Sequence, residues 1–115
     1  MAMTYDYCTV AEIRAAAMGV ETDDYADAAL ELIGNQFAGL LHQELKIDSQ
    51  YTNGTKQWNS AKTYVLEKSA AFIVDQYPDN SINAERHEAR ALLALNALKK
   101  KGSVQKTQGF NNYAE

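Results

Sequence analysis

Few residues of this chain are of the types that perform acid–base, nucleophilic or metal chemistry, and their spacing favours no catalytic site. The two histidines, His42 and His87, lie on different predicted helices, and neither has cysteines or carboxylates around it at the spacing of metal ligands. We therefore expect both to be surface residues, and we expect no metal and no other cofactor. The single cysteine, Cys8, cannot form an internal disulfide. A small buried or half-buried side chain near the first helix is favoured there over a reactive thiol.

The motifs that hold a phosphate, a zinc ion or an activated nucleophile are also missing from the sequence. It contains no glycine-rich phosphate loop, no Gly-x-Ser-x-Gly, no His-Glu-x-x-His and no Cys-x-x-Cys. Two carboxylate pairs have helical spacing, Asp23/Asp27 and Glu85/Glu88. All four residues lie in predicted first turns, where helix capping accounts for them. We expect a protein that is not an enzyme.

The composition is that of a small globular domain. The 115 residues are enough for one domain, and the contents of 46% hydrophobic and 23% charged residues are ordinary. No run approaches the ~20 apolar residues of a membrane span, and MAMTYDYC lacks the basic and apolar regions of a signal peptide. The sequence predicts a soluble protein, made in a cytoplasm, without a membrane partner.

The helix signals predict an all-α fold, a small bundle of four helices around one long central helix. A capping box at Thr9–Glu12 begins a short helix that runs through Met18. The long helix covers residues 22–47, with Thr22 or Asp23 as its cap, and its apolar arc is too broad for a single neighbour to cover. A polar loop over residues 48–54 follows and ends in an Asn-Gly turn.

Two more helices complete the predicted bundle. The third runs from about Thr55 or Gln57 to Tyr77, where Pro78 stops it. The fourth runs from Ile82 to Lys101 and ends at Gly102. Residues 1–8 then form an extended N-terminal arm, residues 9–102 the helical domain and residues 103–115 a C-terminal docking segment.

The second half of the fourth helix is apolar on almost every side. Its four leucines, Leu92, Leu93, Leu95 and Leu98, point in different directions around the helix axis. A helix of this kind is either central in its own bundle or shared with a second molecule. The predicted packing residues between helices or subunits are Leu92, Leu95 and Leu98.

Charge is distributed unevenly along the chain. Residues 1–50 contain nine acidic and two basic side chains, whereas residues 51–115 contain six acidic and nine basic ones. The two halves either pair internally or give the molecule an acidic and a basic side suited to head-to-tail association. The lysines at 99–101 complement the helix dipole, a reading favoured over nucleic-acid binding.

The C-terminal segment contains two aromatic residues but no apolar period. Phe110 and Tyr113, with Lys106, are candidates for docking on a partner, because isolated aromatics in a segment that cannot fold alone act as anchors. A merely frayed end is the alternative reading of this segment.

The order of these features resembles the head–tail connector, or head-completion adaptor, family of tailed bacteriophages. The short capped helix TVAEIRAAAM is followed by the acidic linker ETDDYAD, the long helix ALELIGNQFAGLLHQEL, a polar loop and two more helices, the last rich in alanine and leucine. The resemblance covers about residues 8–98. Many members carry an aromatic–Thr–Gly turn after the long helix, and Tyr51-Thr52-Asn53-Gly54 is a loose version of it.

The resemblance implies a structural virion protein at the head–tail interface, without catalytic activity. Such adaptors form a ring, commonly of twelve copies, below the portal protein. The ring extends the DNA channel and offers the attachment site for a tail or tail-completion protein. Viral DNA passes through it without sequence-specific binding. The acidic residues proposed for the channel surface are Asp23, Asp24, Asp27 and Glu31.

Three other functions compete with the connector interpretation. The first is a small dimeric helical regulatory or binding protein that buries its fourth helix against its twin. The second is a nucleic-acid-binding module that uses the lysines at 99–101 and Lys106, against which the acidic first half argues. The third is a neighbouring phage component such as a tail-completion protein.

Overall fold

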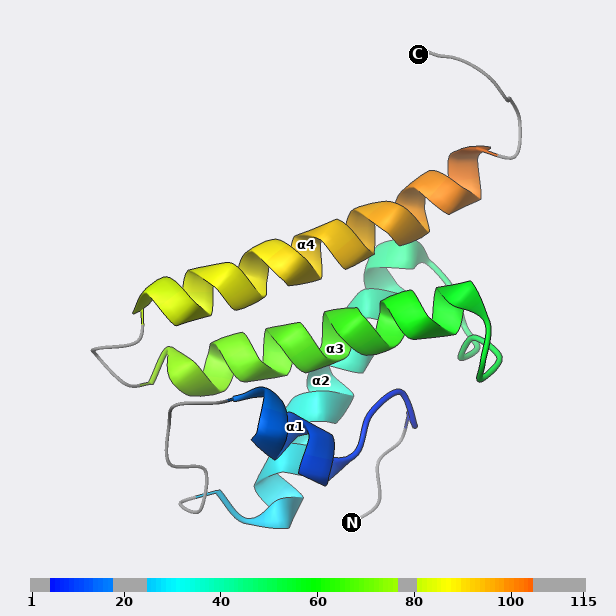
Figure 1. The fold of residues 1–115 in the computed structure, drawn as a ribbon. Helices are drawn as coiled ribbons and strands as arrows, with labels where there is room; N and C mark the ends of the chain where they lie inside the picture. The colour runs from blue at the N-terminus through cyan, green and yellow to red at the C-terminus, as the bar shows by residue number, and fades with distance from the viewer. Residues whose placement is uncertain (1–4, 18–24, 77–80, 105–115) are drawn as a thin grey trace.

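A computed structural model of the chain describes residues 5–17, 25–76 and 81–104. These residues form the helices α1 (Val10–Ala16), α2 (Asp27–Leu45), α3 (Lys56–Val74) and α4 (Ser81–Val104), and no strand is present among them (Figure 1). The described helices include none that is long and apolar enough to cross a membrane. The prediction of a small all-α bundle is confirmed.

Helix α1 begins with the capping box that the sequence predicts. The Glu12 backbone N–H donates to the Thr9 hydroxyl at 3.1 Å, and the Thr9 N–H donates to the Glu12 carboxylate at 2.8 Å. The helix ends at Ala16, two residues before the predicted end at Met18, which lies outside the described residues together with Gly19.

Helix α2 begins at Asp27, five residues after the start predicted at Thr22. A guanidinium nitrogen of Arg14 donates to the Tyr25 carbonyl and to the Asp27 carboxylate, both at 2.8 Å, and Ala26 is held in an extended conformation. A contact from α1 thus fixes where α2 begins, and local capping signals do not reveal such a contact. Thr22 and Asp23 lie outside the described residues.

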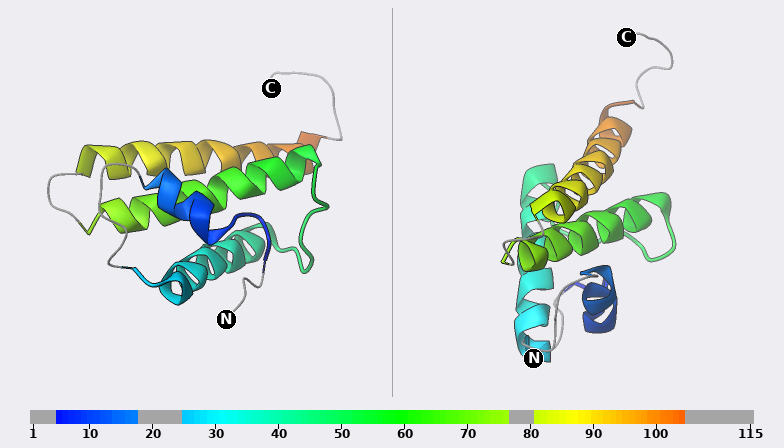
Figure 2. Two further views of the ribbon diagram at one scale, coloured as in Figure 1. Left: turned by 60° about the horizontal axis from the view of Figure 1, so that its bottom comes forward. Right: turned by 60° about the vertical axis from the view of Figure 1, so that its left-hand side comes forward.

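Helix α3 occupies the central position that the sequence suggested for the helix over residues 22–47. It packs along α4 on one side and contacts α1 and α2 on the other, with α2 crossing behind it (Figures 1 and 2). Small residues allow these close approaches on several faces. Its buried residues are Ala61, Tyr64, Val65, Ser69, Ala70, Ala71, Ile73 and Val74.

The ends of α3 follow the predicted turn chemistry closely. Gly54 adopts a φ of 93°, a left-handed conformation that suits glycine, and it closes the predicted loop. The Thr55 hydroxyl then accepts from the Trp58 N–H at 3.1 Å and caps the helix. The helix ends at Val74, three residues before the predicted Tyr77, which lies outside the described residues together with Pro78.

Helix α4 packs on α3 through alanines rather than through most of its leucines. Its buried residues are Ala84, Ala91, Ala94 and Leu98, which recur at helical spacing along one face. An ion pair and a hydrogen bond flank this face: Lys68 pairs with Glu88 at 2.8 Å, and the His87 ring is hydrogen-bonded to the Glu67 carboxylate at 2.6 Å. The helix runs through Gly102, where the sequence predicted its end, to Val104.

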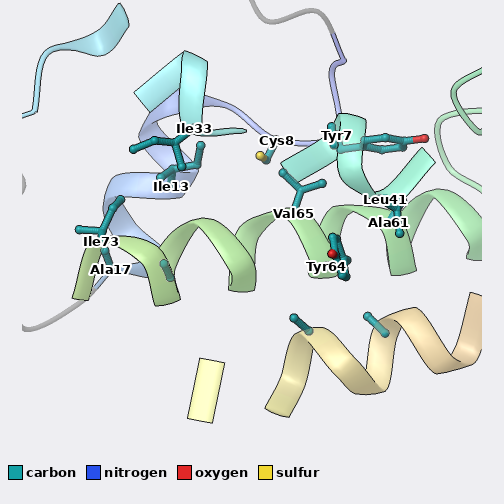
Figure 3. Packing of buried hydrophobic residues seen from close by; sticks show 14 of the residues in the cluster. Tyr7, Cys8, Ile13, Ala17, Ile33, Leu41, Ala61, Tyr64, Val65 and Ile73 are labelled. Carbon is teal, nitrogen blue, oxygen red and sulfur yellow. The ribbon is translucent and has the colours of Figure 1, made fainter. Parts of the chain in front are cut away.

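The last part of the predicted N-terminal arm belongs to the core. The chain bends at Tyr7 and Cys8 instead of forming the extended segment that the sequence predicted, and the two side chains are only 1% and 3% exposed. They lie in the same core as Val65 and Leu41 (Figure 3). The domain therefore begins before the capping box.

The close contact of α3 with α4 yields a prediction about stability. Replacing Ala91 by leucine inserts bulk into a fully buried position, and we expect a loss of about 1–3 kcal/mol in the free energy of unfolding. Urea denaturation followed by circular dichroism measures the loss. Ala97→Leu, at an exposed position of the same helix, is the control and should change stability little. Equal losses in both variants would contradict the proposed packing.

Candidate interaction surface

Large hydrophobic side chains remain exposed on three of the helices. Single exposed leucines are normal on protein surfaces, whereas a group of exposed apolar side chains indicates a contact surface. The exposed set, between 45% and 70% accessible, is Leu32, Leu40, Phe72, Leu92 and Leu93. Phe72 and Leu92 belong to α3 and α4, which lie side by side, and they meet at one place.

Phe37 of α2, Phe72 of α3 and Leu92 of α4 line an open groove of about 640 Å³. We call it the Phe37–Leu92 groove. The two phenylalanine rings meet edge to face with centroids 6.2 Å apart. Alanines on α3 and α4 provide the rest of the apolar lining, which leaves room between the larger side chains. The complete lining is Phe37, Ala71, Phe72, Asp75, Ala84, Glu85, Glu88, Ala89 and Leu92.

The rim of the groove is acidic. Asp75, Glu85 and Glu88 all line it, and only Glu88 has an ion pair with a described residue, at 2.8 Å from the Lys68 ammonium. That ammonium also lies 5.6 Å from the centroid of the Phe37 ring, a cation–π distance. The groove is thus already suited to an apolar group accompanied by a cation.

Leu93 lies in a different setting from Leu92. It lines a shallower depression between α3 and α4 whose other lining residues are mostly polar, namely Asn59, Ser60, Thr63, Arg90 and Ala94. The two neighbouring leucines therefore face different surfaces, and Leu93 provides a matched control for experiments on Leu92.

The structure separates the three leucines that were predicted to pack between helices or subunits. Leu92 is 55% exposed in the groove, Leu95 is half-buried against the core, and Leu98 is only 4% exposed. Leu98 therefore packs within its own chain, between helices. Of the three, Leu92 alone is well exposed and available to a second molecule.

The other predicted site residues are only partly described. Asp27 is exposed and paired with Arg14, and Glu31 is half-buried on α2. The remaining members of the predicted acidic surface, Asp23 and Asp24, lie outside the described residues. The three predicted docking residues, Lys106, Phe110 and Tyr113, lie outside them as well.

His42 is buried, so the prediction of a surface histidine is wrong. Its side chain shares a hydrogen bond of 2.7 Å with the Tyr7 hydroxyl, which also accepts from the Tyr51 backbone N–H at 3.1 Å. Tyr5 packs edge-on against the imidazole. On the helix alone, His42 falls on a polar strip. Tyr5 and Tyr7 of the N-terminal segment cover the strip at His42, and a segment without periodicity could not be placed from sequence.

Burial governs the titration of both Cys8 and His42. It raises the pKa of the Cys8 thiol to about 12 and lowers the pKa of His42, since each charged form would lose its hydration. The prediction of a buried cysteine is confirmed. In the part of the chain that the structure describes, no cluster of three or more histidine, cysteine or carboxylate side chains is placed to hold a metal ion.

Comparison with known proteins gives no match to this chain among family models, curated proteins or solved structures.

The buried histidine makes stability depend on pH. Its pKa in the folded chain lies below the ordinary value of 6.5, so on acidification the unfolded chain binds a proton that the folded chain excludes. The full stability is therefore present above pH 6.5, and part of it is lost as the pH falls toward the lowered pKa. The urea concentration at the midpoint of unfolding should therefore decrease as the pH is lowered from 7.5 to 5.5.

One substitution isolates this effect. His42→Gln has no titrating group at this position and should flatten the dependence between pH 7.5 and 5.5. An unchanged slope in His42→Gln would show that another group is responsible.

The thiol of Cys8 should be inert in the folded chain. With its pKa near 12 and almost no exposure, it forms little thiolate at neutral pH. Ellman's reagent should label Cys8 rapidly in denaturant, while in buffer labelling should occur only as fast as the chain opens. Rapid labelling of the folded chain would contradict the core position of Cys8.

Proposed function

We propose that this chain is a structural adaptor of the head–tail connector kind, which acts by assembling with copies of itself. The observation that carries the proposal is the open Phe37–Leu92 groove, where three helices meet and two large apolar side chains are about half exposed. An exposed apolar surface with polar residues around it is typical of a protein–protein contact. The small all-α fold and the order of its helices also suit such an adaptor.

In this proposal, copies associate through unlike surfaces and form a closed ring, of twelve copies in the commoner connectors. A heterologous contact that repeats with a constant rotation closes into a ring, and many weak contacts then act together. The ring lies at the head–tail interface of the virion, between the portal protein and a tail or tail-completion protein. The C-terminal segment, with Lys106, Phe110 and Tyr113, provides a docking element.

The proposed channel surface uses the acidic first half of the chain. An acidic lining repels the DNA phosphates, so the duplex passes without sequence-specific binding. Glu31 and Asp27 are the described candidates for this surface. The ion pair of Asp27 with Arg14 gives Asp27 a structural role at the start of α2 as well.

The second candidate function is a small helical regulatory or binding protein that dimerises. The Phe37–Leu92 groove favours this function because an apolar groove bordered by helices can also bind an amphipathic helix from a second copy or from another partner. Oligomeric state separates the two functions, because a dimer requires one isologous contact whereas a ring requires two different surfaces.

Native mass spectrometry over a range of protein concentrations tests the proposal. We expect closed oligomers of about a dozen copies, as the connector resemblance implies and as repeated heterologous contacts allow. Where the chain alone stays monomeric, the measurement is repeated with a portal protein present. A stable dimer under all conditions would support the regulatory alternative instead.

Replacing Leu92 by aspartate should weaken assembly without unfolding the domain. The position is 55% exposed, so the substitution places a charge in the contact but removes little from the core. Leu93→Asp adds the same charge one residue further on, outside the groove, and should leave the oligomer intact. Folding of both variants is checked by circular dichroism. If Leu92→Asp assembles like the parent chain, the groove is not the contact.

A further inference from the structure

The Phe37–Leu92 groove has properties that specify what can fill it. Its floor and walls are apolar, with exposed faces of Phe72 and Leu92 that suit an aromatic or large aliphatic side chain. Among the described residues, Asp75 and Glu85 on its rim have no ion-pair partner. An extended segment that carries an aromatic anchor and a nearby cation, and no acidic residue between them, would complement both features.

One segment of this chain has that chemistry. Residues 105–113, which follow α4, contain one cation, Lys106, two aromatics, Phe110 and Tyr113, and no acidic residue. Lys106 precedes Phe110 by four positions, so the cation and the anchor lie close together along the chain.

The location of this segment favours docking on another molecule. The groove borders α4 between Ala84 and Leu92, whereas the segment follows the opposite end of the helix at Val104. At 1.5 Å per residue, Leu92 lies about 18 Å and Ala84 about 30 Å from Val104 along the helix axis. Six fully extended residues from Val104 to Phe110 span at most about 21 Å, little more than the distance back to Leu92 and less than the distance to Ala84, and a reversal of direction uses part of that length.

We propose that the C-terminal segment of one copy docks in the Phe37–Leu92 groove of a second copy. Phe110 packs against Phe72 and Leu92, and Lys106 approaches the carboxylates of Asp75 and Glu85. The contact joins unlike surfaces, the groove beside the first half of α4 and the segment that follows its last residue, so each copy offers both a groove and a segment. Repetition of such a heterologous contact builds a ring or a filament. The inference rests on the proposed adaptor function and specifies its subunit contact.

Disulfide trapping between full-length variants tests the contact. One chain carries Leu92→Cys and another carries Phe110→Cys, and the two are mixed in equal amounts under mild oxidation. We expect a covalent dimer that contains one chain of each kind. The buried Cys8 thiol stays out of the reaction because of its burial and its raised pKa. The matched control is a mixture of Leu93→Cys with Phe110→Cys, which should remain largely monomeric.

A double variant separates docking between copies from docking within one. A chain with both Leu92→Cys and Phe110→Cys should form dimers and larger covalent species, since each link joins two molecules. If it forms only an internally linked monomer while the mixture gives no dimer, the segment folds onto its own groove and the inference is wrong. Equal cross-linking at positions 92 and 93, or none at either, would overturn it too.

Native mass spectrometry of the parent chain, run in parallel, distinguishes failure of this contact from failure of the proposed function. A closed ring without the trapped 92–110 link would overturn the docking but leave the adaptor proposal standing. The trapped link in a chain that forms only dimers would support the docking and count against a ring.

Discussion

The close packing of α3 on α4 is the constraint on which the rest of the structure depends. Alanines at 84, 91 and 94 bring the two helix backbones together. Other faces of α3, which also carry buried small residues, pack against α1 and α2. Because α3 is buried on several faces, each of the other helices needs to cover only one of its sides. A single helix with many small side chains thus organises a bundle in which α1 has only seven residues.

The same packing explains why large apolar side chains remain outside. A helix face of alanines leaves leucines such as Leu92 and Leu93 at other angles around α4. Phe72 of α3 likewise lies outside the α3–α4 packing face, and its ring contacts Phe37 of α2. The lining of the Phe37–Leu92 groove combines three alanines with the longer side chains of Phe37, Phe72 and Leu92.

Local signals predicted what depends on local chemistry. The Thr9–Glu12 capping box, the Asn-Gly turn and the burial of Cys8 all agree with the structure. Signals that depend on tertiary contacts could not be read. The start of α2 is fixed by Arg14 from another helix, and His42 is covered by a segment without periodicity. On α4, leucines suggested a shared helix, whereas alanines provide the face that packs on α3, and Leu98 is buried while Leu92 is exposed.

The net charge of each half of the sequence does not reveal where charged side chains gather on the folded surface. Two described ion pairs, Glu12 with Lys62 and Glu44 with Lys99, join the acidic half to the basic half, so part of that asymmetry is neutralised internally. The acidic rim of the groove instead comes from Asp75 and Glu85, which belong to the half with a basic sum. The half with a basic sum therefore contains both the acidic rim of the groove, beside the first part of α4, and the segment with Lys106 and two aromatics that follows α4. The proposed head-to-tail contact joins these two unlike surfaces of the same half of the chain.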